Sequence, residues 1–201
     1  MTGRGTRIAV LCSGNGTNLQ ALIDAWRGGM LENGEIVLVI ASRPGIFALE
    51  RASANGIPAE IVNRKDCGTP DEYDQAMHAQ LERYRADLVV TAGFLGIVGP
   101  KVLATYEDRI INVHPSLIPS FCGKGFYGLH VHKAALEHGV KVTGATVHMV
   151  NHIVDGGRIL LQKAVEVLPG DTPETLQRRV MEEAEWKTLP KAVAMFCRGE
   201  I

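Results

Sequence analysis

Residues 7–19 read RIAVLCSGNGTNL and contain the strongest indication of the fold class in the sequence. The apolar run at 8–11 predicts a short buried strand, residues 13–18 form a glycine-rich loop, and a helical apolar stripe begins at Leu19. A strand that passes through a glycine loop into a helix is typical of an α/β protein. Backbone N–H groups of such a loop, together with the positive end of the helix, bind anions such as phosphate.

This loop differs from the two common phosphate motifs. No Gly-Lys-Ser/Thr follows it, so it is not a Walker loop, and Leu19 stands where a dinucleotide fingerprint has its third glycine. A small phosphorylated ligand therefore fits better than NAD. The alternative is a plain tight turn with Thr17 or Asn18 as the helix cap, and the loop alone does not decide between them.

The rest of the chain continues the alternation of strand and helix. Short β-branched runs predict strands at residues 7–12, 35–41, 59–62, 87–91, 109–113, 143–150 and 159–167. Helical periodicity predicts helices from residue 19 to a stop at Gly28 and Gly29, at 44–55, at 71–84 with Asp71 as cap, at 129–138 and at 172–196. No helix separates the last two strands, so the predicted α/β fold is a mostly parallel sheet, flanked by helices, with a mixed or antiparallel C-terminal part.

The composition bounds the function. With 201 residues, 46% of them hydrophobic, we expect one globular domain over residues 1–201. A formal net charge of -1 gives no global field for nucleic acid, so an anion must be bound locally. No apolar run approaches a membrane span or a signal-peptide core, and the four cysteines show no zinc or disulfide pattern. We expect a soluble, cytoplasmic protein that binds neither nucleic acid nor membrane.

A polar pair marks the end of the strand at 109–113. Asn112 and His114 are two residues apart, so in an extended chain their side chains point to the same side. The carboxyl end of a strand in an open parallel sheet is where ligands bind. An amide and an imidazole placed there can hydrogen-bond a developing oxyanion, and the imidazole can move protons near neutral pH. A histidine with a purely structural hydrogen bond is the alternative.

Asp155 lies in a glycine turn after the strand that carries His148. Its carboxylate can hold an imidazole in one tautomer or relay a proton, although an Asp-Gly turn also forms for local reasons. His130 and His132 invite a metal interpretation, with His114, His148 and Asp155 as further ligands. We expect no metal, because helical residues two apart do not face each other and no HxxxH or HExxH spacing occurs.

Motifs along nearly the whole chain, from Ile8 to Phe196, resemble the phosphoribosylglycinamide formyltransferase family of purine synthesis. In chain order they are SGNGTNLQ at 13–20, AGF at 92–94, NVHPSLIP at 112–119, GLH at 128–130, TVH at 146–148, and DGG at 155–157 followed by ILLQ at 159–162. The resemblance implies a Rossmann-like formyltransferase fold. It also implies transfer of the formyl group of the co-substrate 10-formyltetrahydrofolate to the amine of glycinamide ribonucleotide.

The resemblance implies roles for individual residues. The catalytic residues of the family correspond to Asn112, His114 and Asp155. Its substrate-phosphate loop corresponds to Gly16, Thr17 and Asn18, and a late glutamate that contacts the glycinamide portion corresponds to Glu185, although matching that helix requires one extra residue. Its folate is held largely by main-chain groups of loops that correspond to Phe94, Leu95, Gly96, Ile97 and Val98 and to Val150, Asn151 and Asp155.

Two departures from the family pattern stand out. Gly96 occupies a position where many relatives carry Arg, and the segment 120–127 is about five residues longer than the common loop. Its glycines suggest a mobile flap. Lys124 at its tip is a candidate contact for a phosphate or for the folate glutamate tail, with an ordinary solvated lysine as the alternative.

The expected mechanism is direct attack of the substrate amine on the formyl carbon. Asn112 and protonated His114 would stabilise the oxyanion, Asp155 would orient His114 and relay the proton, and two separate pockets would hold the phosphate and the pterin. Formyltetrahydrofolate deformylase and methionyl-tRNA formyltransferase are related enzymes, and we expect neither because the chain has no room for their additional domains. A non-catalytic folate or nucleotide binding protein and a metal hydrolase are two further hypotheses, and both monomer and homodimer remain open.

Overall fold

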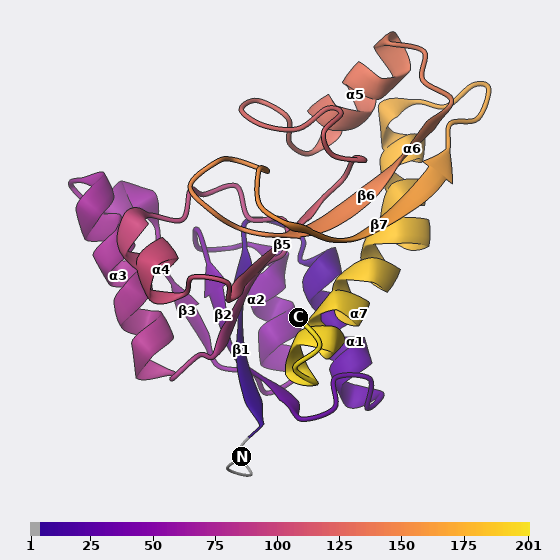
Figure 1. The fold of residues 1–201 in the computed structure, drawn as a ribbon. Coiled ribbons are helices and arrows are strands. Elements are labelled where there is room, and N and C mark those ends of the chain that lie inside the picture. The colour runs from indigo at the N-terminus through magenta and orange to yellow at the C-terminus, as the bar shows by residue number, and fades with distance from the viewer. Residues whose placement is uncertain (1–4) are drawn as a thin grey trace.

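The computed structural model describes residues 5–201, so residues 1–4 of the expected domain lie outside the described part. Within it, one sheet has the strand order β3-β2-β1-β4-β5-β6-β7 (Figure 1). The strands are β1 (Thr6–Cys12), β2 (Gly34–Ala41), β3 (Ala59–Ile61), β4 (Leu88–Thr91), β5 (Ile110–His114), β6 (Val142–Met149) and β7 (Ile159–Glu166). Strands β1 to β5 pair in parallel, and β6 is antiparallel to both β5 and β7. The predicted fold class is confirmed.

Helices cover both faces of this sheet. They are α1 (Thr17–Arg27), α2 (Phe47–Ala54), α3 (Pro70–Arg83), α4 (Pro100–Thr105), α5 (Leu129–Glu137), α6 (Pro173–Val180) and α7 (Trp186–Cys197), with the short 3-10 helix η1 (Arg64–Asp66) and the π-helical segment η2 (Met181–Glu185). None of the helices in residues 5–201 combines the length and the apolar character that a bilayer span requires.

The buried side chains form two cores, one on each face of the sheet. Along β1, Ile8 and Val10 pack into a core with α1, α2, α6 and α7, whereas Ala9 and Leu11 pack against α3 and α4 on the other face. Because both faces of the central strands are covered, their sequences are continuous apolar runs instead of alternating ones. Each fully buried Leu or Ile contributes about 1.5–3 kcal/mol to the stability.

The strand order creates a crevice between β1 and β4. From β1 the chain turns through α1 toward β2, and from β4 it turns through α4 toward β5, so the two connections leave in opposite directions. Figure 1 shows α1 and α4 on opposite faces of the sheet. In open α/β sheets the carboxyl ends of the strands at such a switch point form the ligand site. The glycine loop after β1 and the segment after β4 both lie there.

Three helix predictions were wrong in detail. Helix α3 begins at Pro70, and its cap is Thr69 instead of Asp71, because Thr69 and Glu72 form a reciprocal capping box. Helix α2 begins three residues after the predicted start at Pro44, at Phe47. The last predicted helix is interrupted by η2, and the short elements α4 and η1 had not been predicted, since one or two turns carry little periodic signal.

Candidate active site

A single cleft of about 710 Å³ lies over the carboxyl ends of β1, β4 and β5. The predicted phosphate loop and the predicted folate loop line this same cleft, so the expectation of two separate pockets was wrong. The strand order explains this, because the loops after β1 and β4 lie next to each other. The predicted site residues that line it are Gly16, Thr17, Asn18, Phe94, Leu95, Gly96, Ile97, Asn112, His114, Asp155 and Glu185.

Three predicted folate-loop residues lie outside the lining of the cleft. Val98 is buried in the core beneath α3 and α4, and Val150 packs against the same core. Asn151 is exposed, and its Oδ1 accepts a hydrogen bond from the N–H of Ile153 within the turn. None of these three residues lines the cleft.

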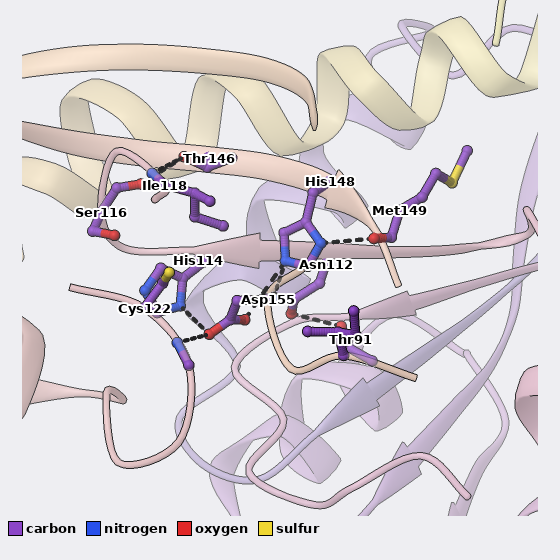
Figure 2. Close-up of polar contacts among 12 residues, drawn as sticks. Thr91, Asn112, His114, Ser116, Ile118, Cys122, Thr146, His148, Met149 and Asp155 are labelled. Carbon is purple, nitrogen blue, oxygen red and sulfur yellow. Dashed lines mark hydrogen bonds and ion pairs between the residues drawn. The ribbon is translucent and has the colours of Figure 1, made fainter. Parts of the chain in front are cut away.

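Asn112 lies in a row of three polar residues that crosses the sheet. In the strand register, Thr91 on β4 is opposite Asn112 on β5, and Asn112 is opposite His148 on β6. Thr91 Oγ1 donates to Asn112 Oδ1 at 2.6 Å, and Asn112 Nδ2 lies 3.0 Å from His148 Nε2 (Figure 2). Sequence reasoning assigned no role to Thr91 and considered His148 only as a metal ligand, since only the strand register reveals their contacts with Asn112.

His114, at the end of β5, lies beside Asp155, which is in the loop between β6 and β7. His114 Nδ1 lies 3.5 Å from Asp155 Oδ2, and His148 Nε2 lies 3.6 Å from Asp155 Oδ1, so the carboxylate sits between two imidazoles (Figure 2). The flap, residues 120–127, contacts both side chains through its main chain. The carbonyl of Phe121 is 2.8 Å from His114 Nε2, and the N–H of Gly123 donates to Asp155 Oδ2 at 2.8 Å. The predicted triad is therefore assembled, and main-chain groups of the flap hold it.

Burial sets the charges of this group. Burial lowers the pKa of His114, and the Asp155 carboxylate and the Phe121 carbonyl oppose that shift without cancelling it. Burial also raises the pKa of Asp155, but the neighbouring imidazoles and the Gly123 N–H outweigh it and hold the pKa below its usual value. The site thus contains a carboxylate beside a buried imidazole that is protonated less readily than a free one.

The glycine loop lines the cleft and leads into the N-terminus of α1. Gly16 is the N-cap of α1 with φ of 69°, so no side chain caps this helix, and the alternative of Thr17 or Asn18 as cap was wrong. The N–H groups of the first helical turn lack intrahelical acceptors and carry the positive end of the helix dipole. A Cβ on Gly16 would lie 2.8 Å from the Cβ of Ala48, so the close packing of α2 also requires glycine.

Glu185 lies beside this loop although 167 residues separate it from Asn18. Asn18 Nδ2 donates to Glu185 Oε2 at 2.6 Å, and both side chains are buried at the cleft wall. Glu185 ends the π-helical segment Met181–Glu185. A π turn accommodates one additional residue in a helix, and the resemblance to the family implied one extra residue in this helix. Burial raises the pKa of Glu185 to about 7, against the Asn18 hydrogen bond, which lowers it.

Stability should depend on pH through Glu185. Its pKa rises from 4.5 in the unfolded chain to about 7 in the folded protein, so the folded state binds more protons between these values. The free energy of unfolding therefore falls from pH 4.5 to 7 and levels off above it. In urea titrations, Glu185→Gln should remove this fall, and Glu183→Gln at an exposed position of the same segment should keep it. Parallel pH curves for wild type and Glu185→Gln would contradict the assignment.

The structure shows the surroundings of the two departures from the family pattern, Gly96 and the long flap. A Cβ on Gly96 would lie 2.6 Å from the Phe94 ring and 2.9 Å from the Tyr73 hydroxyl, so these two side chains fill the space that an arginine would need. In the long flap, Gly123 and Gly125 have φ of 87° and 94°, and the exposed Lys124 between them lines the cleft.

The histidines of the metal interpretation point to different surroundings. His130 is exposed and stacks edge to face on Tyr127, whereas His132 is completely buried, and neither of its ring nitrogens has a partner among residues 5–201. Burial lowers the pKa of His132 to about 4. In the part of the chain that the structure describes, no group of three or more His, Cys, Asp or Glu residues is arranged to hold a metal ion.

Comparison with known proteins places the chain among formyl transferases. The family model described as "Formyl transferase" matches residues 6–193. The phosphoribosylglycinamide formyltransferase of Escherichia coli strain K12 is 36% identical over 194 residues, which cover 96% of this chain and 88% of that protein. The crystal structure of glycinamide ribonucleotide transformylase 1 from Symbiobacterium toebii has a TM-score of 0.92 at 42% identity and covers 98% of this chain and 90% of that chain.

Some curated relatives are much longer proteins. The trifunctional purine biosynthetic protein adenosine-3 of Drosophila melanogaster is 40% identical over 200 residues, which are 99% of this chain and 14% of that protein. The chain spans 14% to 19% of the length of this and similar trifunctional animal relatives. The chain therefore belongs to the phosphoribosylglycinamide formyltransferase group of the formyl transferase family, as the motifs in its sequence predicted.

Proposed function

We propose that the chain transfers the formyl group of 10-formyltetrahydrofolate to the amine of glycinamide ribonucleotide, in purine biosynthesis. One observation carries this proposal. Asn112, His114 and Asp155 converge in one cleft. The same cleft is lined by the glycine loop at the N-terminus of α1 and by the buried side chain of Glu185. A phosphate on the loop, an amine at the carboxylate and an acyl carbon at the polar triad are the three groups that this reaction brings together.

The proposed step is direct acyl transfer without an acyl-enzyme. The amine nitrogen attacks the formyl carbon, the carbonyl electron pair moves to the oxygen, and the tetrahedral oxyanion accepts hydrogen bonds from Asn112 Nδ2 and His114. The amine then loses a proton, the leaving folate nitrogen gains one, and the bond from carbon to that nitrogen breaks. His114 turns its N–H from the Phe121 carbonyl to the oxyanion, and the developing negative charge favours its protonation.

Asp155 and Glu185 have different parts in this proposal. Asp155 is charged at neutral pH and lies 3.5 Å from His114, so it orients the ring and accepts a proton through water on the way to the leaving nitrogen. Glu185, held by Asn18 beside the phosphate loop, fixes the substrate amine. The exposed apolar side chains of Leu95 and Ile97 at the cleft suit the flat pterin ring of the folate.

The remaining proposals concern the molecule as a whole. We propose that residues 1–201 act as one catalytic domain in the cytoplasm, as a monomer or homodimer, with small molecules as partners and without a metal. The cysteine pattern and the near-neutral charge of the sequence support this setting. Cell fractionation and sedimentation of the purified protein would test the compartment and the oligomeric state.

The test of the function is an isotope-transfer assay. The protein is incubated with glycinamide ribonucleotide and 10-formyltetrahydrofolate labelled in the formyl group, and label in the ribonucleotide is counted. Label in formate alone would identify a deformylase, and label in neither would identify a binding protein. Activity that a strong chelator abolishes would favour a metal hydrolase instead.

We expect the Ser13 hydroxyl to support folate binding, because it holds the loop after β4 in place. Its Oγ accepts from the Leu95 N–H at 2.9 Å and from Ser42 Oγ at 2.9 Å, and its N–H donates to the Gly93 carbonyl at 3.1 Å, so it ties the two loops of the cleft together. Ser13→Ala leaves the Leu95 N–H without this acceptor. We expect the KM for the folate to rise about fivefold, roughly 1 kcal/mol, with kcat nearly unchanged.

The matched control is Ser53→Ala, at an exposed position of α2. Steady-state kinetics should show the same folate KM for this variant as for wild type. An unchanged KM in Ser13→Ala would mean that the loop after β4 keeps its shape without the Ser13 hydroxyl, or that folate does not bind there.

A further inference from the structure

Thr91 lies directly behind Asn112 and has no part in the mechanism described above. It ends β4, it is 5% exposed, and the strand register places it opposite Asn112. Figure 2 shows its hydroxyl pointing at the Asn112 amide. The proposed reaction depends on that amide, because only its nitrogen end donates hydrogen bonds.

An asparagine amide has two orientations of nearly equal shape. They exchange the positions of Oδ1 and Nδ2, and only one of them gives the proposed oxyanion an N–H. Thr91 Oγ1 lies 2.6 Å from Asn112 Oδ1 and 3.3 Å from the carbonyl of Ile111, so the shorter contact receives the hydroxyl proton. This contact favours the orientation in which Oδ1 faces Thr91.

His148 favours the same orientation from the other side. Its Nδ1 lies 2.7 Å from the carbonyl of Met149, which can only accept, so Nδ1 carries the proton. In the neutral ring Nε2 is therefore the acceptor, and it receives one N–H of Asn112 at 3.0 Å, whereas Asp155 Oδ1 lies farther from it, at 3.6 Å. The second N–H of the amide remains for a ligand in the cleft, which Asn112 lines.

We infer that Thr91 is a positioning residue for formyl transfer, whose hydroxyl holds the Asn112 amide with its nitrogen toward the reacting oxygen. The inference rests on the proposed function. Donation to Oδ1 also polarises the amide, which strengthens its N–H as a donor, since hydrogen bonds in a chain reinforce one another. Threonine at this position thus acts through Asn112, and it does not touch the substrate.

The kinetic test compares Thr91→Val with Thr91→Ser. Valine keeps the shape and loses the hydroxyl, so we expect kcat to fall about tenfold while the KM of both substrates stays within about twofold. Serine restores the hydroxyl and should recover kcat to within about threefold of wild type. The control is Thr143→Val: Thr143 is buried on β6, and its Oγ1 has no partner within residues 5–201, so kcat should not change.

A second measurement does not depend on the reaction. The NMR signals of the Asn112 side-chain amide, identified by their loss in Asn112→Ala, should show one proton shifted by the bond to His148. This shift should decrease in Thr91→Val, where only His148 still favours this orientation, and persist in Thr91→Ser and Thr143→Val. The inference is overturned if the amide signals of Thr91→Val match wild type, or if its kcat does. If the wild-type protein shows no formyl transfer, the proposed function is refuted instead. The NMR measurement would still show whether Thr91 holds the orientation of the Asn112 amide.

Discussion

Replacement of His114 by alanine is expected to lower kcat for formyl transfer by about 1000-fold. The change removes an oxyanion donor, which is typically worth roughly 100- to 1000-fold, and the group through which protons move. It also leaves Asp155 without the imidazole that lies 3.5 Å from its Oδ2. The measurement is kcat with both substrates saturating, because the loss should lie in the chemical step.

His78→Ala is the matched control for this result. His78 is on α3, bonded to Thr105, and it does not line the cleft. Its variant should retain wild-type kcat. Asn112→Ala and Asp155→Asn should each lose about 100-fold or more, and the double variant of Asn112 and His114 should lose less than the product, since the residues act as a unit. Near-wild-type turnover in all three single variants would refute the site.

Replacement of Gly16 by alanine is expected to raise the KM for glycinamide ribonucleotide about 30-fold. Glycine at this N-cap has φ of 69°, and a Cβ would lie 2.8 Å from the Ala48 Cβ, so the loop has to move away from α2. A shift of a few tenths of an ångström weakens the charge-assisted bonds between main-chain N–H groups and phosphate. Losing one such bond costs about 2 kcal/mol, which corresponds to the expected change.

Gly29→Ala separates this effect from backbone strain. Gly29 has φ of 80°, and a Cβ there meets nothing within 4 Å. Both variants should lose about 1 kcal/mol of stability from the left-handed backbone, but only Gly16→Ala should lose affinity for the ribonucleotide. The folate KM serves as an internal reference and should change little. Equal ribonucleotide KM values for Gly16→Ala and wild type would place the phosphate elsewhere.

The sequence predicted much of the fold because the fold depends on local patterns. An apolar run that is buried on both sides, such as residues 36–41, identifies a central strand by itself, and Gly28 ends α1 as expected. The predicted positions of the strands agree with the structure to within one or two residues. Local patterns were insufficient where an element was short, as in α4, or where two caps competed, as at Thr69 and Asp71.

The site was predictable as a set of residues and not as a geometry. Gly16, Asn112, His114 and Asp155 stand at strand ends, loops and turns whose chemistry is visible in the sequence, and the family resemblance supplied Glu185. The partners that hold these residues were not visible. The carbonyl of Phe121 and the N–H of Gly123 are main-chain groups of a long loop, and such groups carry no residue type that a motif could reveal.

Local patterns and motifs in the sequence identify the first strand, loop and helix, the class of sheet, and the candidate site residues. The contacts between these residues follow only from the folded chain: Thr91 with Asn112, 21 residues apart, Asn112 with His148, 36 apart, and Asn18 with Glu185, 167 apart. The spacing of apolar residues shows which face of a helix or strand is buried, because that face is made by residues close together in the sequence. Strand register and the burial of Glu185 depend on how distant segments pack, so they follow only from the assembled sheet and its helices.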